Sequence, residues 1–367
     1  MKTKAAVLYE YGKPLVIEEL ELSPPKENEV LIKMTASGIC HSDLSMTTGK
    51  LPMKTPCVPG HEGAGVIEEV GPGVTNLKVG DHVICSLSPS CGKCVMCTSG
   101  MMHMCTETSS VIWDATMVDG TRRLKKGDVE IGQAICLGTF AERAVIPAGS
   151  AIKVAHNAPL DTVCLIGCGV TTGVGAALNT VSIKPGDSVA IIGGGGVGLS
   201  IMQGAKIAGA TTIIMIDPVE EKRELALSLG ATDVVDPFAG DPVKTVRKLS
   251  KGGVHFAFEA LGRKETIEQS WGMVRLTGTA VIVGVPALDT VVDVPVVGFF
   301  AGRRMKGSFY GSSNPPVDLP KYVDLYQSGE LKLDEMITQR IPLEDVNRAL
   351  DEMSRGEGAR SVIMYDM

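Results

Sequence analysis

The sequence predicts a β-rich domain with long loops and an α/β domain built on a doubly wound parallel sheet. Three observations support this. First, 367 residues are too many for one ordinary hydrophobic core. Second, residues 1–150 contain short β-type runs separated by glycine and proline, with the clearest strands at 30–34, 65–70 and 81–84. Third, from about residue 170 continuous apolar runs alternate with helical stretches, as in parallel sheets covered on both faces.

The α/β alternation can be followed element by element. We expect strands at 189–192, 212–216, 234–235, 255–258 and 279–283, with helices at 197–208 and 219–229. After about residue 310 the pattern becomes mixed, and we expect a helix at 343–354 and a closing strand at 361–365.

Composition narrows the class of protein. The chain is 44% hydrophobic and 21% charged, has a net charge of −7 and shows no basic stripe, so nucleic acid and anionic membranes are poor partners. No run of about 18 apolar residues and no signal-like N-terminus is present. We therefore expect a cytoplasmic protein whose ten cysteines serve as metal ligands or core residues rather than as disulfides.

The first turn of the α/β domain is a glycine motif. It satisfies G-x-G-x-x-G through Gly193, Gly195 and Gly198. Between a strand and a helix, these glycines would form the tight turn, admit a pyrophosphate and allow close helix packing. The amides of the following helix would receive the phosphate charge. A flexible glycine turn is the alternative interpretation of the motif alone.

An acidic residue in the right place indicates which dinucleotide binds. Asp217 ends the second strand, 19 residues after Gly198. A carboxylate there accepts hydrogen bonds from the ribose of NAD and repels the extra phosphate of NADP. Pro218 and Glu220 supply no cation, although Lys222 and Arg223 follow closely. We therefore predict NAD.

Four cysteines in one loop have the spacing of a metal site. The pattern C-x₂-C-x₂-C-x₇-C suits a closed, tetrahedral structural zinc and consists of Cys91, Cys94, Cys97 and Cys105. The alternatives are a disulfide or redox pair, an iron–sulfur cluster, and a zinc ribbon for nucleic acid. Lys93 alone makes a poor basic surface, which weighs against the last.

A second set of metal-binding residue types is dispersed along the chain. Cys40, His61 and Cys168 each lie beside glycine. Two thiolates and one imidazole, with a fourth position left for water or substrate, make a catalytic zinc site. Taken singly, each residue would more often be a core cysteine or a turn histidine. The neighbouring cofactor motif favours the metal site.

These motifs occur in an order that resembles the zinc-containing medium-chain alcohol dehydrogenases. The resemblance extends from Lys4 to Tyr365. It implies a GroES-like catalytic domain at 1–169 and 310–367, a Rossmann NAD-binding domain inserted at 170–309, and two zinc ions per subunit. In detail the chain resembles the long-loop, class III branch and its bacterial nicotinoprotein (NDMA-dependent) members, so the NAD would be tightly bound.

The resemblance also implies roles for individual residues. Ser42 would accept the proton of the alcohol, which zinc makes more acidic. Asp43 would hydrogen-bond the free nitrogen of His61. Glu62 would stand behind the zinc, and Thr172 would support the nicotinamide. The expected cofactor-binding residues are His41, Gly193, Gly195, Gly196, Val197, Gly198, Asp217, Lys222, Val283, Val285 and Arg360.

Two departures from the family pattern affect function. Many relatives carry a histidine three residues after the relay hydroxyl, where this chain has Ser45. The charged groups with which class III enzymes anchor glutathione are also missing, because residues 51–55 hold no acid and Ser109 replaces an arginine.

The positions that line the family's alcohol pocket are apolar or nearly so. They are Leu51, Leu87, Cys136, Leu137, Val285 and Phe309. Such a pocket prefers an uncharged alkyl, allylic or aromatic alcohol. We predict reversible oxidation of a primary or secondary alcohol to an aldehyde or ketone, with hydride passing to NAD.

Two other functions stay open. One is a formaldehyde dehydrogenase that acts on an adduct with a thiol other than glutathione. The other is a non-catalytic relative that binds NAD and zinc. The stretch 298–308 aligns with the family's dimer contact, so we also expect a homodimer or homotetramer.

Overall fold

The computed structural model describes residues 1–109 and 112–365. The side chain of Ser109 lies outside the described part. The chain divides into two compact units: unit 1 comprises Met1–Cys168, Asn314–Gly329 and Leu333–Met367, and unit 2 comprises Gly169–Ser313 and Glu330–Lys332. The domain limits expected from the sequence, 1–169 with 310–367 and 170–309, remain a proposal.

Unit 2 is built on a six-stranded sheet in the order β13-β12-β11-β14-β15-β16, and every neighbouring pair is parallel. This order confirms the predicted doubly wound sheet. The central strand is buried along its whole length, as its apolar sequence requires. The strands are β11 (Ser188–Ile192), β12 (Thr212–Ile216), β13 (Asp233–Val235), β14 (Val254–Glu259), β15 (Val274–Ile282) and β16 (Arg304–Gly307).

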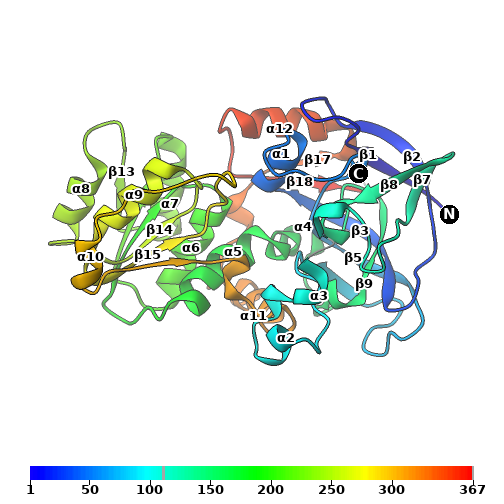
Figure 1. The fold of residues 1–367 in the computed structure, drawn as a ribbon, viewed down its shortest axis with the longest axis horizontal. Helices are drawn as coiled ribbons and strands as arrows, with labels where there is room; N and C mark the ends of the chain where they lie inside the picture. The colour runs from blue at the N-terminus through cyan, green and yellow to red at the C-terminus, as the bar shows by residue number, and fades with distance from the viewer. Residues whose placement is uncertain (110–111, 366–367) are drawn as a thin grey trace. The chain divides into compact units, whose positions relative to one another are not determined.

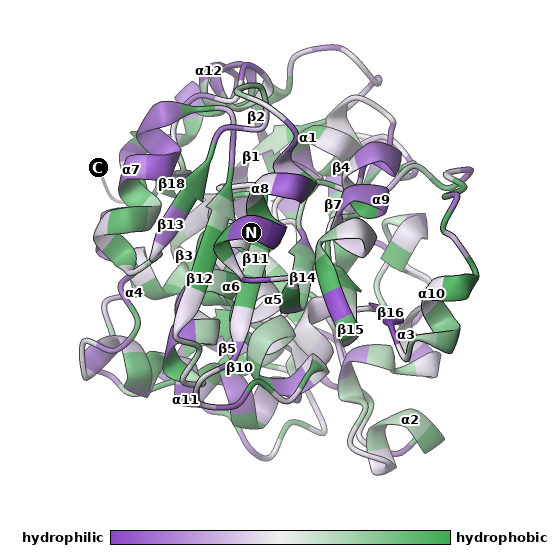
Figure 2. Cartoon of the chain, turned by 90° about the vertical axis from the view of Figure 1, so that its left-hand side faces the viewer, coloured by the Kyte–Doolittle hydropathy of each residue, from purple (hydrophilic) through white to green (hydrophobic). Residues whose placement is uncertain are grey.

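Helices alternate with these strands along the chain, drawn from green through yellow to orange in Figure 1. In Figure 2 the strands of the sheet are largely green or white, while α7 carries purple, hydrophilic surface. The core of the sheet joins residues such as Ile214, Ala257 and Trp271. The helices are α5 (Gly169–Gly175), α6 (Gly196–Ile207), α7 (Glu220–Leu229), α8 (Pro242–Leu249), α9 (Lys264–Met273) and α10 (Val297–Phe300), with a π-helix at Ala176–Thr180.

Unit 1 is β-rich, as predicted, and contains two sheets. The five-stranded sheet has the order β1-β2-β7-β8-β4. The seven-stranded sheet has the order β10-β6-β5-β3-β18-β17, and β9 also pairs with β3. The strands are β1 (Lys2–Val7), β2 (Val16–Leu22), β3 (Glu29–Ile39), β4 (Cys57–Val58), β5 (Glu62–Val70), β6 (His82–Cys85), β7 (Leu124–Lys126), β8 (Val129–Gln133), β9 (Arg143–Pro147), β10 (Ala151–Lys153), β17 (Ile337–Pro342) and β18 (Arg360–Met364).

The helices of unit 1 are mostly short and lie in the connections between strands. The predicted helix at 343–354 forms as a 3₁₀ turn, Leu343–Asp345, followed by α12. The predicted closing strand forms as β18, which pairs with β3 and β17. The α-helices are α1 (His41–Thr47), α2 (Val95–Thr98), α3 (Thr106–Ser109), α4 (Leu160–Val163), α11 (Pro315–Gln327) and α12 (Val346–Ser354).

Among the helices of residues 1–109 and 112–365, none is by itself both long and apolar enough to cross a bilayer. One bent pair, Leu160–Gly167 with Gly169–Thr180, passes by length and composition alone.

Candidate active site

Two strand ends in unit 1 bring the dispersed metal-binding residues together. Cys40 directly follows β3, and His61 directly precedes β5. These strands pair antiparallel with Gly38 opposite Glu62, so the end of one lies beside the start of the other. Cys168 follows a 3₁₀ helix that contacts β5. The possible ligand atoms of Cys40, His61, Glu62 and Cys168 all lie within 4.8 Å of one another, and the four side chains are buried.

The turn that presents His61 requires glycine. Gly60 has a φ of +91°, a left-handed conformation that other residues rarely adopt. A Cβ atom there would also stand 2.5 Å from the backbone nitrogen of Phe140. Both constraints exclude larger residues at position 60.

One buried carboxylate connects the two ligand-bearing segments. Asp43 is fully buried in α1. Its Oδ2 accepts a hydrogen bond from the backbone nitrogen of Cys40 at 2.9 Å, and its Oδ1 accepts from the backbone nitrogen of Gly60 at 3.1 Å. Oδ1 also lies 2.9 Å from Nδ1 of His61. This contact leaves Nε2 of the imidazole as the nitrogen for a metal, the usual arrangement for a ligating histidine.

One member of the cluster, Glu62, forms a buried ion pair with Arg360. The guanidinium of Arg360 donates from Nη2 to Oε2 of Glu62, and both side chains are at least 95% buried. The two residues are 298 positions apart in the chain. The structure thus directs Arg360 toward Glu62, while its expected contact with a pyrophosphate remains a proposal.

The electrostatics of the cluster favour a metal-binding thiolate. A hydrogen bond with Cys168 is the largest influence on Cys40 and holds the pKa of that thiol well below its ordinary value, although burial opposes the shift. Burial alone would lower the pKa of His61, but the Asp43 carboxylate and Cys40 together raise it to about 10. Thiolates are the form of cysteine that binds metals, so the environment of Cys40 suits ligation.

The donor set fits a catalytic zinc. Two thiols and one imidazole are the ligands of an open zinc site, in which the fourth position is free for water or substrate. Glu62, the fourth candidate donor, is already engaged with Arg360. Cys40, His61 and Cys168 would therefore hold the ion.

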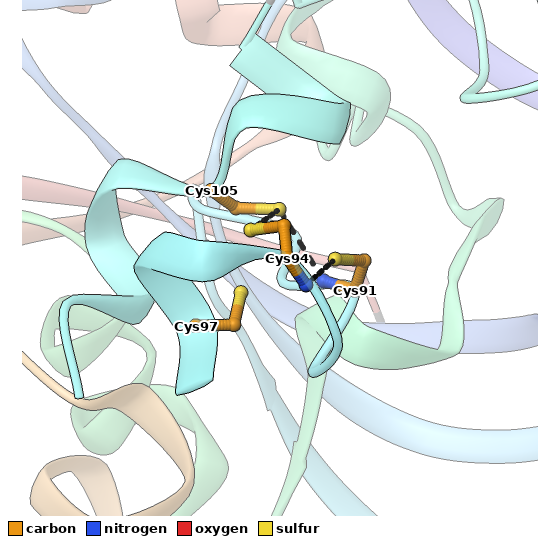
Figure 3. A group of neighbouring side chains, drawn as sticks. All are labelled: Cys91, Cys94, Cys97 and Cys105. Carbon is orange, nitrogen blue, oxygen red and sulfur yellow. Dashed lines mark hydrogen bonds between the residues drawn. The ribbon is translucent and has the colours of Figure 1, made fainter. Parts of the chain in front are cut away.

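The second predicted metal site is also assembled, on a loop of unit 1. Figure 3 shows the four thiols of Cys91, Cys94, Cys97 and Cys105 grouped together, and these sulfur atoms lie within 4.8 Å of one another. The sulfurs of Cys94 and Cys105 are 3.9 Å apart. That distance is close to the edge of about 3.8 Å expected for a tetrahedron with zinc–sulfur bonds of about 2.3 Å.

Backbone amides support negative charge in this loop. Hydrogen bonds from the backbone of Cys97 and Thr106 lower the pKa of Cys94 to about 5. The backbone nitrogen of Cys91 donates to the sulfur of Cys105 at 3.4 Å, and that of Cys94 to the sulfur of Cys91 at 3.3 Å. Amide donors of this kind stabilise thiolates, so the loop fits a closed structural zinc with no position left for substrate.

In unit 2 the glycine turn has the shape that the motif predicts. Gly193 has a φ of +104°. A Cβ atom on Gly198 would stand 1.7 Å from the carbonyl oxygen of Gly193, so helix α6 packs against the turn only with glycine there. A Cβ atom on Gly195 would meet nothing within 4 Å, which leaves open space beside the backbone where α6 begins. Such a turn can admit a phosphate.

Asp217 lies at the carboxyl end of β12, next to this turn. Its Oδ2 accepts a hydrogen bond from the backbone nitrogen of Gly194 at 2.7 Å, and its Oδ1 accepts from that of Val219 at 2.9 Å. Each carboxylate oxygen has a second lone pair, so the acid can still accept hydrogen bonds from a ribose.

The other expected site residues fall into exposed and buried groups. In unit 1, His41 is exposed and Ser42 half-buried on α1, while Leu51 and Leu87 are half-buried against the core. Cys136 and Leu137 are completely buried in hydrophobic clusters, and the thiol of Cys136 contacts the carbonyl oxygen of Thr116. In unit 2, Val283 is buried, whereas Thr172, Gly196, Val197, Lys222, Val285 and Phe309 are partly or well exposed.

Two contacts were missed by reasoning from the sequence. One is the Glu62–Arg360 pair. The other is the position of Arg223, whose Nη1 donates to the carbonyl oxygens of Asp217 and Pro218, both at 2.8 Å. The sequence signal that could have revealed the Arg223 contact is its position in the first turn of a helix, where the helix dipole disfavours a cation.

Taken together, an open metal cluster and a dinucleotide-type turn are typical of a metal-dependent oxidoreductase. Comparison with known proteins makes this class definite. Residues 26–156 match the alcohol dehydrogenase GroES-like domain, and residues 196–328 match the zinc-binding dehydrogenase family.

Individual relatives match over the whole chain. An NDMA-dependent alcohol dehydrogenase of Amycolatopsis methanolica is 43% identical, covering 100% of this chain and 99% of the relative. The class-3 alcohol dehydrogenase of Drosophila melanogaster is 40% identical, covering 99% and 97%. The crystal structure of benzyl alcohol dehydrogenase from Acinetobacter calcoaceticus superposes with a TM-score of 0.95 at 33% identity, covering 100% and 99%.

The chain therefore belongs to the zinc-dependent alcohol dehydrogenase family. Membership confirms the fold class predicted from the sequence, a GroES-like domain with a Rossmann domain. It also confirms the enzyme class, an alcohol dehydrogenase that depends on zinc and NAD.

Replacing Asp43 should weaken the dispersed zinc site. Asp43→Asn removes the negative charge beside His61. It also replaces one carboxylate oxygen by an amide nitrogen, which cannot accept a hydrogen bond from the N–H groups of Cys40, Gly60 or His61. We expect zinc affinity at that site to fall about 10- to 100-fold. Zinc content after dialysis against graded chelator measures the loss, and the four-cysteine site should keep its ion.

Asp81→Asn is the matched control. Asp81 is a buried acid of the same unit that accepts a hydrogen bond from the backbone nitrogen of Lys78, pairs with Lys153 and belongs to neither metal cluster. Retention of both zinc ions by Asp43→Asn at every chelator concentration would contradict the role of Asp43.

Proposed function

We propose that the protein oxidises an uncharged primary or secondary alcohol to an aldehyde or ketone, with NAD as hydride acceptor. The observation that carries this is the pair of separate cysteine clusters. Four cysteines form a closed set, and Cys40, His61 and Cys168 form an open one. An open zinc site beside a carboxylate pair suits chemistry on an oxygen atom rather than a structural role.

The chain's own residues would divide the work as follows. Zinc, when bound, supplies Lewis acidity that lowers the pKa of an alcohol, and NAD accepts the hydride. Ser42 would receive the proton, and Asp43 would hold His61 in one orientation. Thr172 would support the nicotinamide, and Asp217 would favour NAD over NADP by repelling a 2′-phosphate.

An apolar alcohol is the substrate class that we favour. Four of the expected pocket positions, Leu51, Leu87, Val285 and Phe309, are apolar and at least partly exposed. The other two, Cys136 and Leu137, are completely buried, and burial raises the pKa of the Cys136 thiol to about 12. A similar protein of known structure is a benzyl alcohol dehydrogenase. Benzyl and allylic alcohols are therefore the first substrates to test.

The function can be tested with two cysteine variants. Wild-type protein should oxidise benzyl alcohol when NAD is present or already bound. Cys40→Ser should lose one zinc ion and the alcohol oxidation, since it removes a ligand of the open site. Cys164→Ser should keep both, because Cys164 is equally buried and belongs to neither metal cluster.

The same assay separates the other candidate functions. An S-(hydroxymethyl)glutathione dehydrogenase of Synechocystis sp. is 39% identical to this chain, which favours a formaldehyde–thiol adduct as the second candidate substrate. Turnover of formaldehyde only with an added thiol would replace the alcohol proposal. Zinc and NAD binding without turnover of any alcohol would identify a non-catalytic relative.

The proton should leave the site without a histidine relay. Ser42 and Ser45 lie three residues apart on α1 and therefore share one face. Both are half-buried, and neither hydroxyl bonds to a residue within 1–109 or 112–365. Water can therefore connect them to solvent.

Introducing a base at position 45 should create a pH dependence. Ser45→His adds a group with an ordinary pKa of about 6.5. The rate of alcohol oxidation should rise as the pH increases through that value, because only neutral imidazole accepts a proton. Ser45→Asn should show no such step in kcat over the same pH range. A step already present in the wild type and abolished by Ser45→Ala would contradict the proposal.

We also propose a cytoplasmic homodimer, or a homotetramer built from two such dimers, formed through the edge of the parallel sheet. β16 is the last strand of the sheet order, and exposed Val296, Val297 and Phe300 lie nearby in the chain, the last being 90% exposed. A shallow groove of about 380 Å³ is lined there by Trp271, whose buried Nε1 has no partner among the described residues. Exposed apolar surface beside a strand edge is typical of subunit contacts.

Sedimentation equilibrium tests the assembly. Wild type should have twice the chain mass of 38.6 kDa, or a multiple of that, and Phe300→Asp should dissociate toward monomer. Phe238→Asp is the control, since Phe238 is 86% exposed and lies after β13, the opposite edge strand of the sheet order. A monomeric wild type, or equal effects of both variants, would refute this contact.

A further inference from the structure

Arg223 holds an unusual position at the cofactor end of unit 2. It lies in the first turn of α7, where the helix dipole disfavours a cation, and it follows Glu220 and Glu221. Helix stability therefore does not explain its placement. Its contacts do, because Nη1 donates to the carbonyl oxygens of Asp217 and Pro218 at the end of β12.

Most of the hydrogen-bonding capacity of Arg223 is unused. A guanidinium has five N–H donors, of which the two on Nη1 serve the carbonyls. The donors on Nε and Nη2 bond to none of the residues that the structure describes, and the side chain is half-buried. Three donors in a fixed, planar arrangement match the oxygens of a phosphate.

A second cation adjoins the same turn. The Cβ atom of Lys222 would lie 3.3 Å from a Cβ atom built on Gly194, so the base of this side chain packs against the glycine turn. Neither Lys222 nor Arg223 forms an ion pair with an acid in the described parts of the chain. A Cβ atom built on Gly194 would also stand 3.2 Å from Oδ2 of Asp217, so this carboxylate and the base of Lys222 border the same point of the turn.

We propose that Arg223, assisted by Lys222, forms a subsite for the 2′-phosphate of NADP that the charge of Asp217 keeps weak. The proposal rests on the proposed NAD-dependent function and refines its cofactor selectivity. Asp217 lies where a dinucleotide ribose is bound, and an arginine beside that position is the group that accommodates a 2′-phosphate. The protein then prefers NAD because the single negative charge of Asp217 repels the 2′-phosphate, and it binds NADP as a weaker alternative cofactor.

Two nucleotide fragments isolate this subsite from the rest of the cofactor. Adenosine 5′-monophosphate and adenosine 2′,5′-bisphosphate differ only in the 2′-phosphate. Calorimetric titration of cofactor-free protein gives the ratio of their two dissociation constants. Effects on adenine binding or on folding act on both ligands and cancel in the ratio.

The expected changes follow from the charges. Asp217→Asn should shift the ratio toward the bisphosphate by about a hundredfold, since it removes a repulsive charge beside the phosphate. Adding Arg223→Met to that variant should lower the preference for the bisphosphate again, by about tenfold or more. This is the loss in binding expected when charge-assisted hydrogen bonds to a phosphate are removed. The gain should also shrink at high salt.

Arg247→Met is the matched control. Arg247, on α8, makes the same kind of contact as Arg223. Its Nη1 donates to the carbonyl oxygens of Gly272 and Val274, both at 3.3 Å. Arg247→Met should leave the ratio of the two dissociation constants within about twofold of the wild-type value, because substitutions at separate sites act independently.

The outcomes separate the two proposals. An unchanged bisphosphate preference in the Asp217→Asn, Arg223→Met double variant would overturn the subsite. If Asp217→Asn does not fold, the single variant Arg223→Met tests the subsite. It must weaken binding of the bisphosphate relative to the monophosphate by about threefold or more. Failure of the wild type to bind NAD or either fragment would instead overturn the proposed cofactor.

Discussion

The buried carboxylate of Asp43 is the interaction on which the metal centre of unit 1 depends. It accepts hydrogen bonds from the backbone nitrogens of Cys40 and Gly60 and contacts Nδ1 of His61. A buried charge of this kind is stable only when its hydrogen bonds are complete. The turn after β3 and the turn before β5 must therefore keep their native positions together, and these are the turns that carry two of the three ligands.

The Glu62–Arg360 pair adds a second constraint on the same centre. Bound zinc would be neutralised by the thiolates of Cys40 and Cys168, and Asp43 and Glu62 would each add a negative charge. Arg360, on β18, offsets one of these charges, and β18 pairs with β3. The C-terminal segment is thus part of the electrostatic environment of the metal site, although it lies far from Glu62 in sequence.

The sequence predicted what depends on local spacing. The four cysteines of one loop and the glycines of one turn are each recognisable because their ligands are close in the chain. Cys40, His61 and Cys168 were predictable only together with the cofactor motif. The Glu62–Arg360 pair was not predictable, because it depends on the pairing of β3 with β5 and β18. Nor was the turn at Ile135 and Cys136, where both residues have positive φ without the glycine or asparagine that usually signals it.

Asp217 repeats at the cofactor end what Asp43 does at the metal end. Each acid accepts two backbone N–H groups from turns that follow or precede strands: Cys40 and Gly60 in one case, Gly194 and Val219 in the other. In both acids, the carboxylate oxygens that hold the turns in place also carry the negative charge of the site. A substitution that alters the charge must also disturb the turns.

Selectivity for the cofactor can therefore be adjusted with less structural cost at a neighbouring residue than at the acid. Arg223 is such a residue, because it contacts the carbonyl oxygens of Asp217 and Pro218 rather than the carboxylate. Its charge can be changed while the hydrogen bonds of Asp217 to Gly194 and Val219 stay in place. At the metal centre, by contrast, Arg360 bonds directly to the carboxylate of Glu62.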